Sequence, residues 1–453
     1  TGPVCTGTNT FPPSSSLPSL AASTTMSQGQ ASEPHTSVRF TTKLEPRWVV
    51  SDTPLDLPTR LSRYGLSEVV NHLLGASPAR PFDFLLDGEL LRGSLGKALA
   101  ARGLSGESTI TLEYIELLAP PQPRGEALVP DWISSLALAA PGSSVASSNP
   151  VLSGCYDGAA YLWDASGVQA AAFGGGEGAA AVKAVAWLGE RPVMASKDGA
   201  VRVWAAGGSA GGAAQLSCVG HHAAVACLAA APAADSLATG GWDRSILLFR
   251  PPSDGVPAAS SEPPPSKRAR GGASAVTAAV ASEELAAAAQ LCGHTDCVSA
   301  LAWPTAALLY SASWDGTVRE WDAAVGAATA TLSSSGKAAL CLDVSLSPAI
   351  VATGHSDHQL RLWDARSRGG APTGAIPHHG WVSSVAWCGV REHLLVSGCH
   401  DGGVRLWDTR SPRVALHSLP RHKGKALCVA WDGADAVVSG GTDGQLRIST
   451  LAA

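Results

Sequence analysis

The sequence predicts an all-β fold, a seven-bladed β-propeller, preceded by a small α+β domain. A segment with a turn aspartate in its interior recurs seven times, and these aspartates follow one another at spacings of 41, 45, 72, 42, 44 and 42 residues. The chain holds 49 Gly and 30 Pro, which favours an architecture with many tight turns. About 80 residues before the first repeat follow another rhythm, in which two helical stretches interrupt short alternating strands.

Residues 1–37 are expected to form a disordered extension, because Ser, Thr and Pro dominate this segment. The first 38 residues contain no Lys or Arg, which argues against a signal or transit peptide. One interpretation is that native translation starts at Met26; an N-terminal peptide from native protein that begins upstream of Met26 would exclude it. No stretch of 18 apolar residues exists, so no membrane span is predicted.

Residues 38–118 predict a ubiquitin-like β-grasp domain of order β-β-α-β-β-α-β. The first two strands are "VRFTTK" and "RWVVSDTPLDLP", and the second ends at Pro58. The segment "RYGLSEVVNHLLG" is a helix that stops at Gly75. Two short strands flank Asp87–Gly88, "SLGKALAARG" is a short helical turn, and "STITLEYIEL" is the last strand. Without a C-terminal Gly-Gly tail, the domain is not expected to be a conjugated modifier.

Residues 119–130 are expected to be a linker that contains the strand closing the propeller. The last repeat ends at "LRISTLAA", without residues for a fourth strand. A propeller avoids an exposed edge by taking a strand from the other end of the chain. We therefore expect the donor strand within 117–130, close to Ala127–Val129, with its length limited by the prolines there.

The propeller is expected over residues 131–453, and each unit carries an aspartate in the turn between two strands. There the side chain can accept backbone N–H bonds, and the Gly that often follows tolerates a positive φ. The seven turn aspartates are Asp157, Asp198, Asp243, Asp315, Asp357, Asp401 and Asp443.

These units resemble WD repeats over roughly residues 130–450. Trp-Asp stands at 163–164, 321–322, 363–364 and 407–408, and Gly-His begins a repeat at 220–221 and 293–294. The resemblance implies that His294, Asp315 and Trp321, with Ser311 or Ser313, form the buried hydrogen-bonded network of one blade. Residues 174–181 and 333–338 lack Gly-His, so their blades are expected to have a weaker network.

An enzyme is not predicted, although Ser, His and Asp recur together in these units. An active site would appear once, whereas the same aspartate appears seven times at a structural turn. The ten cysteines include no C-x-x-C pair, and Cys155 and Cys399 occupy equivalent positions in two repeats. Small buried thiols in a reducing compartment explain this pattern better than disulfides or zinc. We expect no catalytic residue and no metal or cofactor of the chain's own.

An insertion at about 251–288, rich in Pro, Ser, Gly and Ala, explains the 72-residue spacing and is expected to be a disordered surface loop. Within it, Lys267, Arg268 and Arg270 form a short basic cluster. This cluster is interpreted as a nuclear import signal or an RNA contact, and a solvated charge run is the alternative. The net charge of −5 gives no global basic field, so RNA binding would need a local patch.

Together these parts resemble the WD-repeat subunit of the Pescadillo–Bop–WD-repeat (PeBoW) complex. The resemblance rests on "RYGLSEVVNHLLG", "PFDFLLDGELLR", "LEY", "DWISSL" and "SGCYDG", and covers about residues 38–450. It implies a non-enzymatic assembly factor of the large (60S) ribosomal subunit in the nucleolus and nucleoplasm, needed for maturation of the 5.8S and 25S/28S rRNA. It also implies a propeller that docks a Bop-type partner alongside Pescadillo, and a ubiquitin-like domain that engages the AAA ATPase midasin on the pre-60S particle.

In this family, the acid just before the last strand of the ubiquitin-like domain completes the Mg²⁺ coordination of the midasin adhesion site. Glu107 stands at the matching position, after "LSG" and before the strand Ser108–Glu116. Mg²⁺ takes hard oxygen ligands, so a carboxylate suits this role, and the metal would belong to the partner. The competing acids are Glu113 and Glu116 on the strand, and Asp87 and Glu89 at another turn.

Trp242 and Trp314 are the candidates for contact with the Bop-type partner, because each stands just before its blade's turn aspartate. Packing between blades is the alternative for both. The alternative function for the whole chain is a WD-repeat substrate receptor of a ubiquitin ligase. The absence of an F-box-like helical segment weighs against that function.

Overall fold

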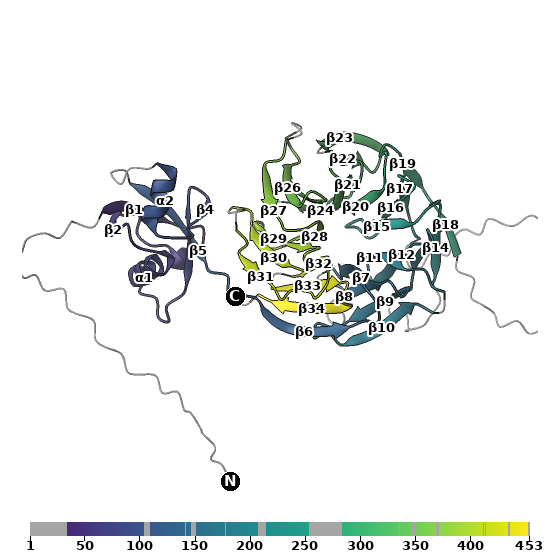
Figure 1. The fold of residues 1–453 in the computed structure, drawn as a ribbon, viewed down its shortest axis with the longest axis horizontal. Helices are drawn as coiled ribbons and strands as arrows, with labels where there is room; N and C mark the ends of the chain where they lie inside the picture. Colours follow the sequence, from purple (N-terminus) through teal and green to yellow (C-terminus); the bar gives the residue numbers. More distant parts are fainter. Residues whose placement is uncertain are drawn as a thin grey trace, which may run out of the picture. The chain divides into compact units, whose positions relative to one another are not determined.

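Strands dominate the protein, and seven sheets are arranged as blades around a common centre (Figure 1). The structure is a computed structural model that describes residues 34–103, 109–140, 142–145, 151–176, 178–206, 214–252, 283–334, 336–346, 349–367, 371–410, 412, 414–433 and 435–451. An eighth sheet belongs to the N-terminal domain. The predicted fold class, a seven-bladed propeller after a small α+β domain, is confirmed. No helix within the described ranges is long and apolar enough to cross a membrane.

The N-terminal domain contains a five-stranded sheet of order β2-β1-β5-β3-β4 and two helices. Its elements are β1 His35–Thr41, β2 Leu55–Pro58, α1 Arg63–Leu74, β3 Phe82–Leu86, β4 Glu89–Leu90, α2 Leu95–Arg102 and β5 Ile110–Glu116. The central strand β5 buries alternate residues, Ile110, Leu112 and Tyr114, which is the period expected of a strand with one face on the core. Tyr114 meets Phe82 edge-on at a centroid distance of 5.5 Å.

Two details of this domain differ from the sequence prediction. The second strand begins at Leu55, and the residues just after Glu45 form instead a short 3₁₀ turn, η1 (Pro46–Trp48). Proline at the first position of this turn has a preset φ and no N–H for a sheet ladder. In α1, Leu73 is exposed, although the helical spacing of apolar residues in "RYGLSEVVNHLLG" places it with Leu66 and Val70, while Asn71 is buried and its amide donates to the Ser67 carbonyl at 2.8 Å.

Each propeller blade has four antiparallel strands, and the first of them lies nearest the centre (Figure 1). Blade 1 contains β7 Ile133–Leu138, β8 Val151–Cys155, β9 Ala159–Trp163 and β10 Gln169–Gly174. Blade 2 contains β11 Val182–Leu188, β12 Arg191–Ser196, β13 Val201–Val203 and β14 Leu216–Val219. Blade 3 contains β15 Val225–Ala230, β16 Leu237–Gly241, β17 Ile246–Phe249 and β19 Ala289–Leu291. Blades 4 and 5 are β20 Val298–Ala302, β21 Leu308–Ser313, β22 Thr317–Asp322, β23 Ala327–Ser334; and β24 Ala339–Leu346, β25 Ala349–His355, β26 Gln359–Asp364, β27 Gly374–Pro377. Blades 6 and 7 are β28 Val382–Trp387, β29 Leu394–Cys399, β30 Val404–Asp408, β31 His417–Ser418; and β32 Ala426–Asp432, β33 Ala436–Gly441, β34 Gln445–Thr450, β6 Gln122–Leu128.

The apolar core lies between neighbouring blades. One cluster joins Ile246 and Leu248 of blade 3 to Val298, Leu309 and Trp321 of blade 4. The inner strands contact one another in a closed cycle, since β32 of blade 7 touches β7 of blade 1. Every blade therefore buries apolar surface on both of its neighbours, which is the main favourable contribution to folding.

The strand that closes this cycle is β6, which pairs antiparallel with β34. It lies within the window 117–130 but begins at Gln122, further upstream than Ala127–Val129. A register shift between Ile448 and Ser449 leaves Arg124 outside the pairing, and Pro123 pairs beyond the bulge. This irregularity explains how a proline is accommodated in a strand of seven residues.

The insertion in blade 3 is shorter than the predicted 251–288. Residues 253–282 lie outside the described ranges, but β18 (Glu283–Ala286) follows them and adds a parallel fifth strand to blade 2 through β14. Leu285 packs against the apolar cluster between blades 2 and 3. The prediction of disorder was therefore wrong for residues 283–288, because one leucine and an open strand edge are enough to order this segment.

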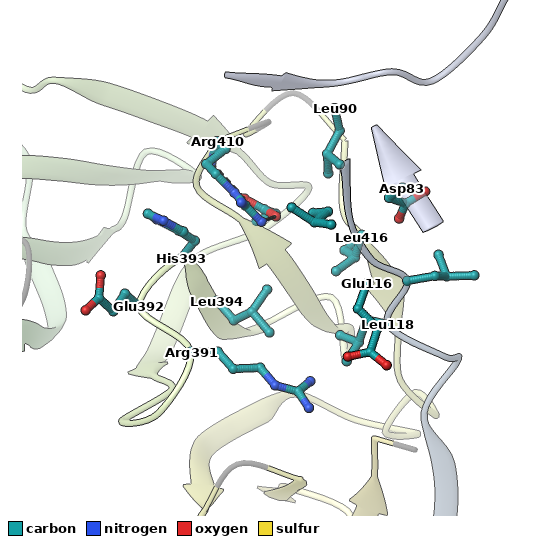
Figure 2. Close-up of a pocket in the computed structure, with 13 residues that line it drawn as sticks. Asp83, Leu90, Glu116, Leu118, Arg391, Glu392, His393, Leu394, Arg410 and Leu416 are labelled. Atoms are coloured by element: carbon teal, nitrogen blue, oxygen red, sulfur yellow. Dashed lines mark hydrogen bonds and ion pairs between the residues drawn. The ribbon is translucent and has the colours of Figure 1, made fainter. Parts of the chain in front are cut away.

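The segment after β5 is attached to blade 6. Leu118 packs against the apolar cluster that contains Leu394, as Leu416 does (Figure 2). The carbonyl oxygen of Leu118 accepts a hydrogen bond from His417 Nε2 at 3.1 Å. These contacts fix the start of the linker that leads into β6.

Gly125→Ala is expected to lower the free energy of unfolding by about 1–3 kcal/mol, the usual cost of overpacking. A Cβ at Gly125 in β6 would overlap the carbonyl oxygen of Ser166. Urea unfolding followed by circular dichroism measures the loss. Gly374→Ala in β27, the outer strand of blade 5, is the matched control, because a Cβ there meets only Leu362 Cδ1 at 3.6 Å. Equal losses in the two variants would contradict the assigned role of Gly125.

Candidate functional site

One end of the propeller carries all seven turns with the predicted aspartates. In every blade, the residue before the aspartate donates its backbone N–H to the carbonyl of the residue that leads into the inner strand. These pairs are Tyr156–Trp132, Lys197–Ala181, Trp242–Ala224, Trp314–Cys297, Ser356–Ala338, His400–Trp381 and Thr442–Lys425. We call this end, formed by the seven turns and the loops before the inner strands, the turn face.

Each turn aspartate organises its own turn. The Asp315 carboxylate, for example, accepts the N–H of Thr317 at 2.8 Å. In all seven blades the residue after the aspartate has a positive φ, and in five of the blades this residue is Gly. Arg244 (φ 68°) and His358 (φ 67°) adopt the same backbone conformation without being glycine. Conformations of this kind cost free energy for non-glycine residues, so the aspartate bonds hold these two turns in place.

Blade 4 contains the network that the WD resemblance implies. His294 Nδ1 lies 2.9 Å from Asp315 Oδ2, and His294 Nε2 lies 2.7 Å from Ser311 Oγ. Trp321 Nε1 donates to the same Ser311 hydroxyl at 2.8 Å. Ser313, the other serine considered, instead donates to the Asp296 carbonyl and accepts the Asp315 N–H. Both ring nitrogens of His294 are therefore engaged in fixing the turn.

The ionisation of this network follows from its contacts. Burial of the Asp315 carboxyl opposes its ionisation, but hydrogen bonds from Thr317, Thr295 and His294 outweigh burial and lower its pKa to about 2. Burial also lowers the pKa of His294, against the opposite effect of Asp315. The pair thus keeps a charged carboxylate and a ring that resists protonation at neutral pH.

The seven aspartates use three kinds of partner. Asp243 and Asp443 are held by His221 and His422, at 2.8 and 2.9 Å, in the same way as Asp315. In blades 2, 5 and 6, an arginine four residues later takes this place, pairing Arg202 with Asp198, Arg361 with Asp357 and Arg405 with Asp401. Asp157 accepts the Tyr161 hydroxyl at 2.5 Å.

Sequence reasoning missed several of these groups. Only Gly-His pairs were sought, whereas His422 follows an arginine and His378 follows a proline. His378 Nε2 bonds Ser397 Oγ at 2.8 Å, and His355, which comes from a strand of its own blade, bonds Thr353 Oγ1 at 2.8 Å. Burial lowers the pKa of both His355 and His378 to about 4. The recurrence of Arg four residues after Asp was the available signal for the other blades.

Trp242 and Trp314 contact each other across blades 3 and 4. Their ring centroids lie 5.6 Å apart, yet 51% and 42% of the two residues remain exposed. They are therefore inter-blade contacts and surface aromatics at the same time. Trp132 and Trp381 are two further exposed tryptophans on the turn face that the sequence analysis did not single out.

Two sets of predicted site residues fall outside the described ranges, namely Glu107 and the cluster Lys267, Arg268 and Arg270. The surroundings of both are described. Before Glu107, α2 ends at Arg102 and its C-cap Gly103 has the left-handed conformation; after it, β5 begins at Ile110. Pro252 is the last described residue before the basic cluster, and its carbonyl oxygen accepts a hydrogen bond from Arg191 Nη1 at 3.2 Å.

Within the described residues, no group of three or more His, Cys, Asp or Glu side chains is arranged to hold a metal ion. Cys155 and Cys399 are buried as thiols, and burial raises the pKa of Cys155 to about 11. Such thiols pack as small apolar groups and are poor nucleophiles.

Comparisons with known proteins give matches in both parts of the chain. The family model "NLE (NUC135) domain" matches residues 36–99, and "WD domain, G-beta repeat" matches residues 213–250, 287–322, 326–364, 370–408 and 413–448. The repeat model thus matches five segments, whereas the structure forms seven blades. Blade 1 and the first three strands of blade 2 lie outside the matched segments, whereas β14 of blade 2 lies within 213–250.

Curated relatives cover most of the chain. A "Ribosome biogenesis protein WDR12 homolog" of Chlamydomonas reinhardtii is 39% identical over 92% of this chain and 98% of its own length. Proteins with the same name from Oryza sativa subsp. japonica and Arabidopsis thaliana are 37% and 32% identical, over 80% and 77% of this chain and 85% and 82% of their own lengths.

Propeller stability is expected to fall as the pH drops from about 6.5 to about 4. The pKa of about 4 for His355 and His378 lies below the value of about 6.5 for an unfolded histidine, so the unfolded chain binds more protons in this window. Asp343, whose pKa burial raises to about 6, acts in the opposite direction. Each histidine changes the free energy of unfolding by up to about 1.4 kcal/mol per pH unit.

Urea unfolding at several pH values, for the chain and for His355→Gln/His378→Gln, measures this slope. The double variant should show a shallower pH dependence, whatever its stability at neutral pH. His222→Gln, at an exposed site on the same face, should keep the original slope. An unchanged slope in the double variant would show that neither histidine contributes to the pH dependence of the free energy of unfolding.

Proposed function

Because the chain belongs to the WDR12 family of ribosome biogenesis proteins, we propose that it is a non-enzymatic assembly factor of the large (60S) ribosomal subunit. In this proposal it acts in the nucleolus and nucleoplasm and is needed for maturation of the 5.8S and 25S/28S rRNA. The observation that carries the proposal is the 39% identity to a family member over 98% of that member's length. The match takes in the N-terminal domain as well as the repeats, and repeats alone are shared by proteins of many functions.

A scaffold rather than an enzyme is supported by how the polar groups are used. Residues of the same types as His294, Asp315 and Ser311 recur in other blades of the ring. In blade 4 these side chains hydrogen-bond to one another and to the backbone of the turn. A catalytic nucleophile needs a base and an open position for substrate. We propose that the chain uses no cofactor of its own.

The propeller is proposed to dock the Bop-type partner, alongside Pescadillo. Exposed tryptophans with few rotamers are favoured anchors at protein interfaces. Trp242 and Trp314 support this role because their backbones are held by the turn bonds while about half of each residue stays exposed. Their mutual contact also limits the conformational entropy lost on binding.

The N-terminal domain is proposed to engage midasin through Glu107, which would complete the coordination of a partner-held Mg²⁺. A metal-bridging carboxylate must come from a short, well-anchored connection, because Mg²⁺ demands near-ideal octahedral geometry. Residues 104–109 connect the capped end of α2 to β5, the central strand of the sheet. This anchoring on both sides supports the proposal.

Glu107→Ala and Glu107→Asp are expected to abolish Mg²⁺-dependent binding to the midasin adhesion domain. Alanine removes the ligand, and aspartate shortens its reach by one methylene, roughly 1.5 Å. Surface plasmon resonance with and without EDTA measures the binding. Glu89→Ala is the matched control, since Glu89 is an exposed acid near another turn of the same domain.

The expected cellular result of Glu107→Ala is dominant: the complex loads on the pre-ribosome and is not removed. Both Glu107 variants should still bind the Bop-type partner through the propeller. Normal midasin binding by Glu107→Ala would refute this assignment.

Trp242→Ala/Trp314→Ala is expected to weaken capture of the Bop-type partner by at least tenfold, because interface anchors of this size each contribute about 2 kcal/mol or more. Pull-down with purified partner gives the affinity, and circular dichroism tests the fold. Trp132→Ala/Trp381→Ala, with similar exposure on the same face, is the control. Unchanged capture with an intact spectrum would exclude the pair as the docking site.

Changing Lys267, Arg268 and Arg270 together to Ala is expected to raise the cytoplasmic fraction of a fluorescent fusion. Three clustered cations in a Pro- and Ser-rich insertion form the electrostatic pattern of an import signal. Quantitative imaging against the unchanged fusion measures the effect. If the nucleolar signal stays the same, import depends on a partner or on another segment.

A further inference from the structure

The turn face carries two aromatic pairs besides Trp242–Trp314. In blade 1, Trp132 and Tyr156 lie 5.5 Å apart, and in blade 6, Trp381 stacks on His400 at 5.4 Å with an interplanar angle of 30°. Trp132 and Trp381 are both 47% exposed. Each pair joins the loop before an inner strand to the turn of the same blade through a backbone hydrogen bond. The exposed rings are therefore rigidly placed.

A cluster of cations lies in blade 7, which is between these two pairs because the ring closes from blade 7 to blade 1. The side chains of Arg421, Lys423 and Lys425 are exposed. The backbone of their loop is held by Asp443, which accepts the Lys423 N–H at 3.0 Å, and by Thr442, whose hydroxyl accepts the Lys425 N–H at 2.8 Å. The cations are thus presented on a fixed loop.

The cation cluster adjoins both aromatic pairs. Arg421 donates to the carbonyl of Asp401, the residue after His400, and the pKa of His400 is lowered by burial and, to a smaller extent, by the charge of Lys425. On the other side, Gly444 of blade 7 accepts the Val129 N–H at 2.9 Å, three residues before Trp132. Beyond Trp132, Lys183 Nζ lies 4.8 Å from the centroid of the Tyr156 ring. Aromatic, cationic and aromatic groups therefore follow one another across blades 6, 7 and 1.

Exposed cations gather in this region although the chain carries a net charge of −5. The turn acids of these blades are hydrogen-bonded within their own blades, Asp401 to Arg405, Asp443 to His422 and Asp157 to Tyr161, and Arg405 also balances the charge of Asp401. Asp131 is an exposed acid beside them, and its carboxylate accepts the Trp132 N–H at 2.8 Å. Three exposed cations, Arg421, Lys423 and Lys425, therefore lie near two exposed acids, Asp131 and Glu126, and Glu126 is paired with Arg447 at 3.5 Å.

We propose that this region of blades 6, 7 and 1 binds single-stranded RNA. Exposed aromatic rings stack on bases of any sequence, and cations set between them neutralise phosphates, which is how single strands are held without base readout. An acidic peptide would use the cations but has no need of two exposed aromatic platforms. The site is separate from the docking pair Trp242–Trp314 on blades 3 and 4, and it goes beyond the proposed scaffold function.

The test is fluorescence anisotropy with the full chain and a labelled single-stranded RNA of roughly 12 nucleotides, a length within the usual site sizes. The site variants are Lys423→Gln/Lys425→Gln and Trp132→Ala/Trp381→Ala. The controls are Lys197→Gln/Arg244→Gln, two exposed cations on the same face, and Trp242→Ala/Trp314→Ala. All variants also carry Ala at 267, 268 and 270, so that the basic insertion does not mask a loss.

Each site variant should weaken RNA binding by about tenfold or more, and each control by less than about twofold. The lysine variant should also reduce the salt dependence of the affinity, with a slope smaller by about one to two, which the tryptophan variant leaves unchanged. Site variants that keep the Bop-type partner, and a Trp242→Ala/Trp314→Ala variant that keeps RNA, separate this proposal from the docking function.

Equal RNA affinity in all variants would overturn the proposal. So would double-stranded RNA bound as tightly as single-stranded RNA, because paired bases cannot stack on the rings. Displacement of the RNA by an equimolar polyglutamate peptide would assign the region to an acidic protein segment instead.

Discussion

Closure of the ring between blades 7 and 1 is the constraint on which the propeller depends. Each blade is too thin to form a core alone, and it buries its faces on its two neighbours. The last interface brings Val129, Ile133 and Trp163 together with Leu446 and Ile448, and the pairing of β6 with β34 adds to the contacts that β7 makes with β32 and β33. A strand from before the first blade thus completes a sheet formed by the end of the chain. Local pairing within blades cannot supply this contact, which joins residues more than 300 positions apart.

The turn aspartates hold the backbone of the turn face in a fixed conformation. Their carboxylates fix the turns, and the backbone bond from the preceding residue fixes the adjacent loop. His, Arg and Tyr serve as alternative partners because each places a hydrogen-bonding group 2.5 to 2.9 Å from the carboxylate. Side chains next to the aspartate, such as Trp242 and Trp314, are then free to vary without loss of the fold. The side chains available for binding can therefore differ from blade to blade on the turn face.

The sequence predicted those features that repeat or that depend on local pattern. The seven aspartates revealed the number of blades, and the missing last strand indicated where the closing strand must come from. What it did not reveal depends on tertiary neighbours. His355 reaches Thr353 from within its own strand, and β18 finds its place only because blade 2 leaves β14 open. The grouping of Trp381, Lys425 and Trp132 requires knowing that blade 7 lies beside blade 1.

The function proposed for this two-part chain is assembly of the large ribosomal subunit. Affinity purification of the full chain from nuclear extract tests it most directly, with mass spectrometry of the proteins and probing of the co-purified RNA for spacer-containing precursors. The account predicts a Bop-type protein, Pescadillo, midasin and large-subunit precursors that carry 5.8S and 25S/28S sequences. Cullin subunits in place of pre-60S factors would contradict it and would assign the propeller to a ubiquitin ligase.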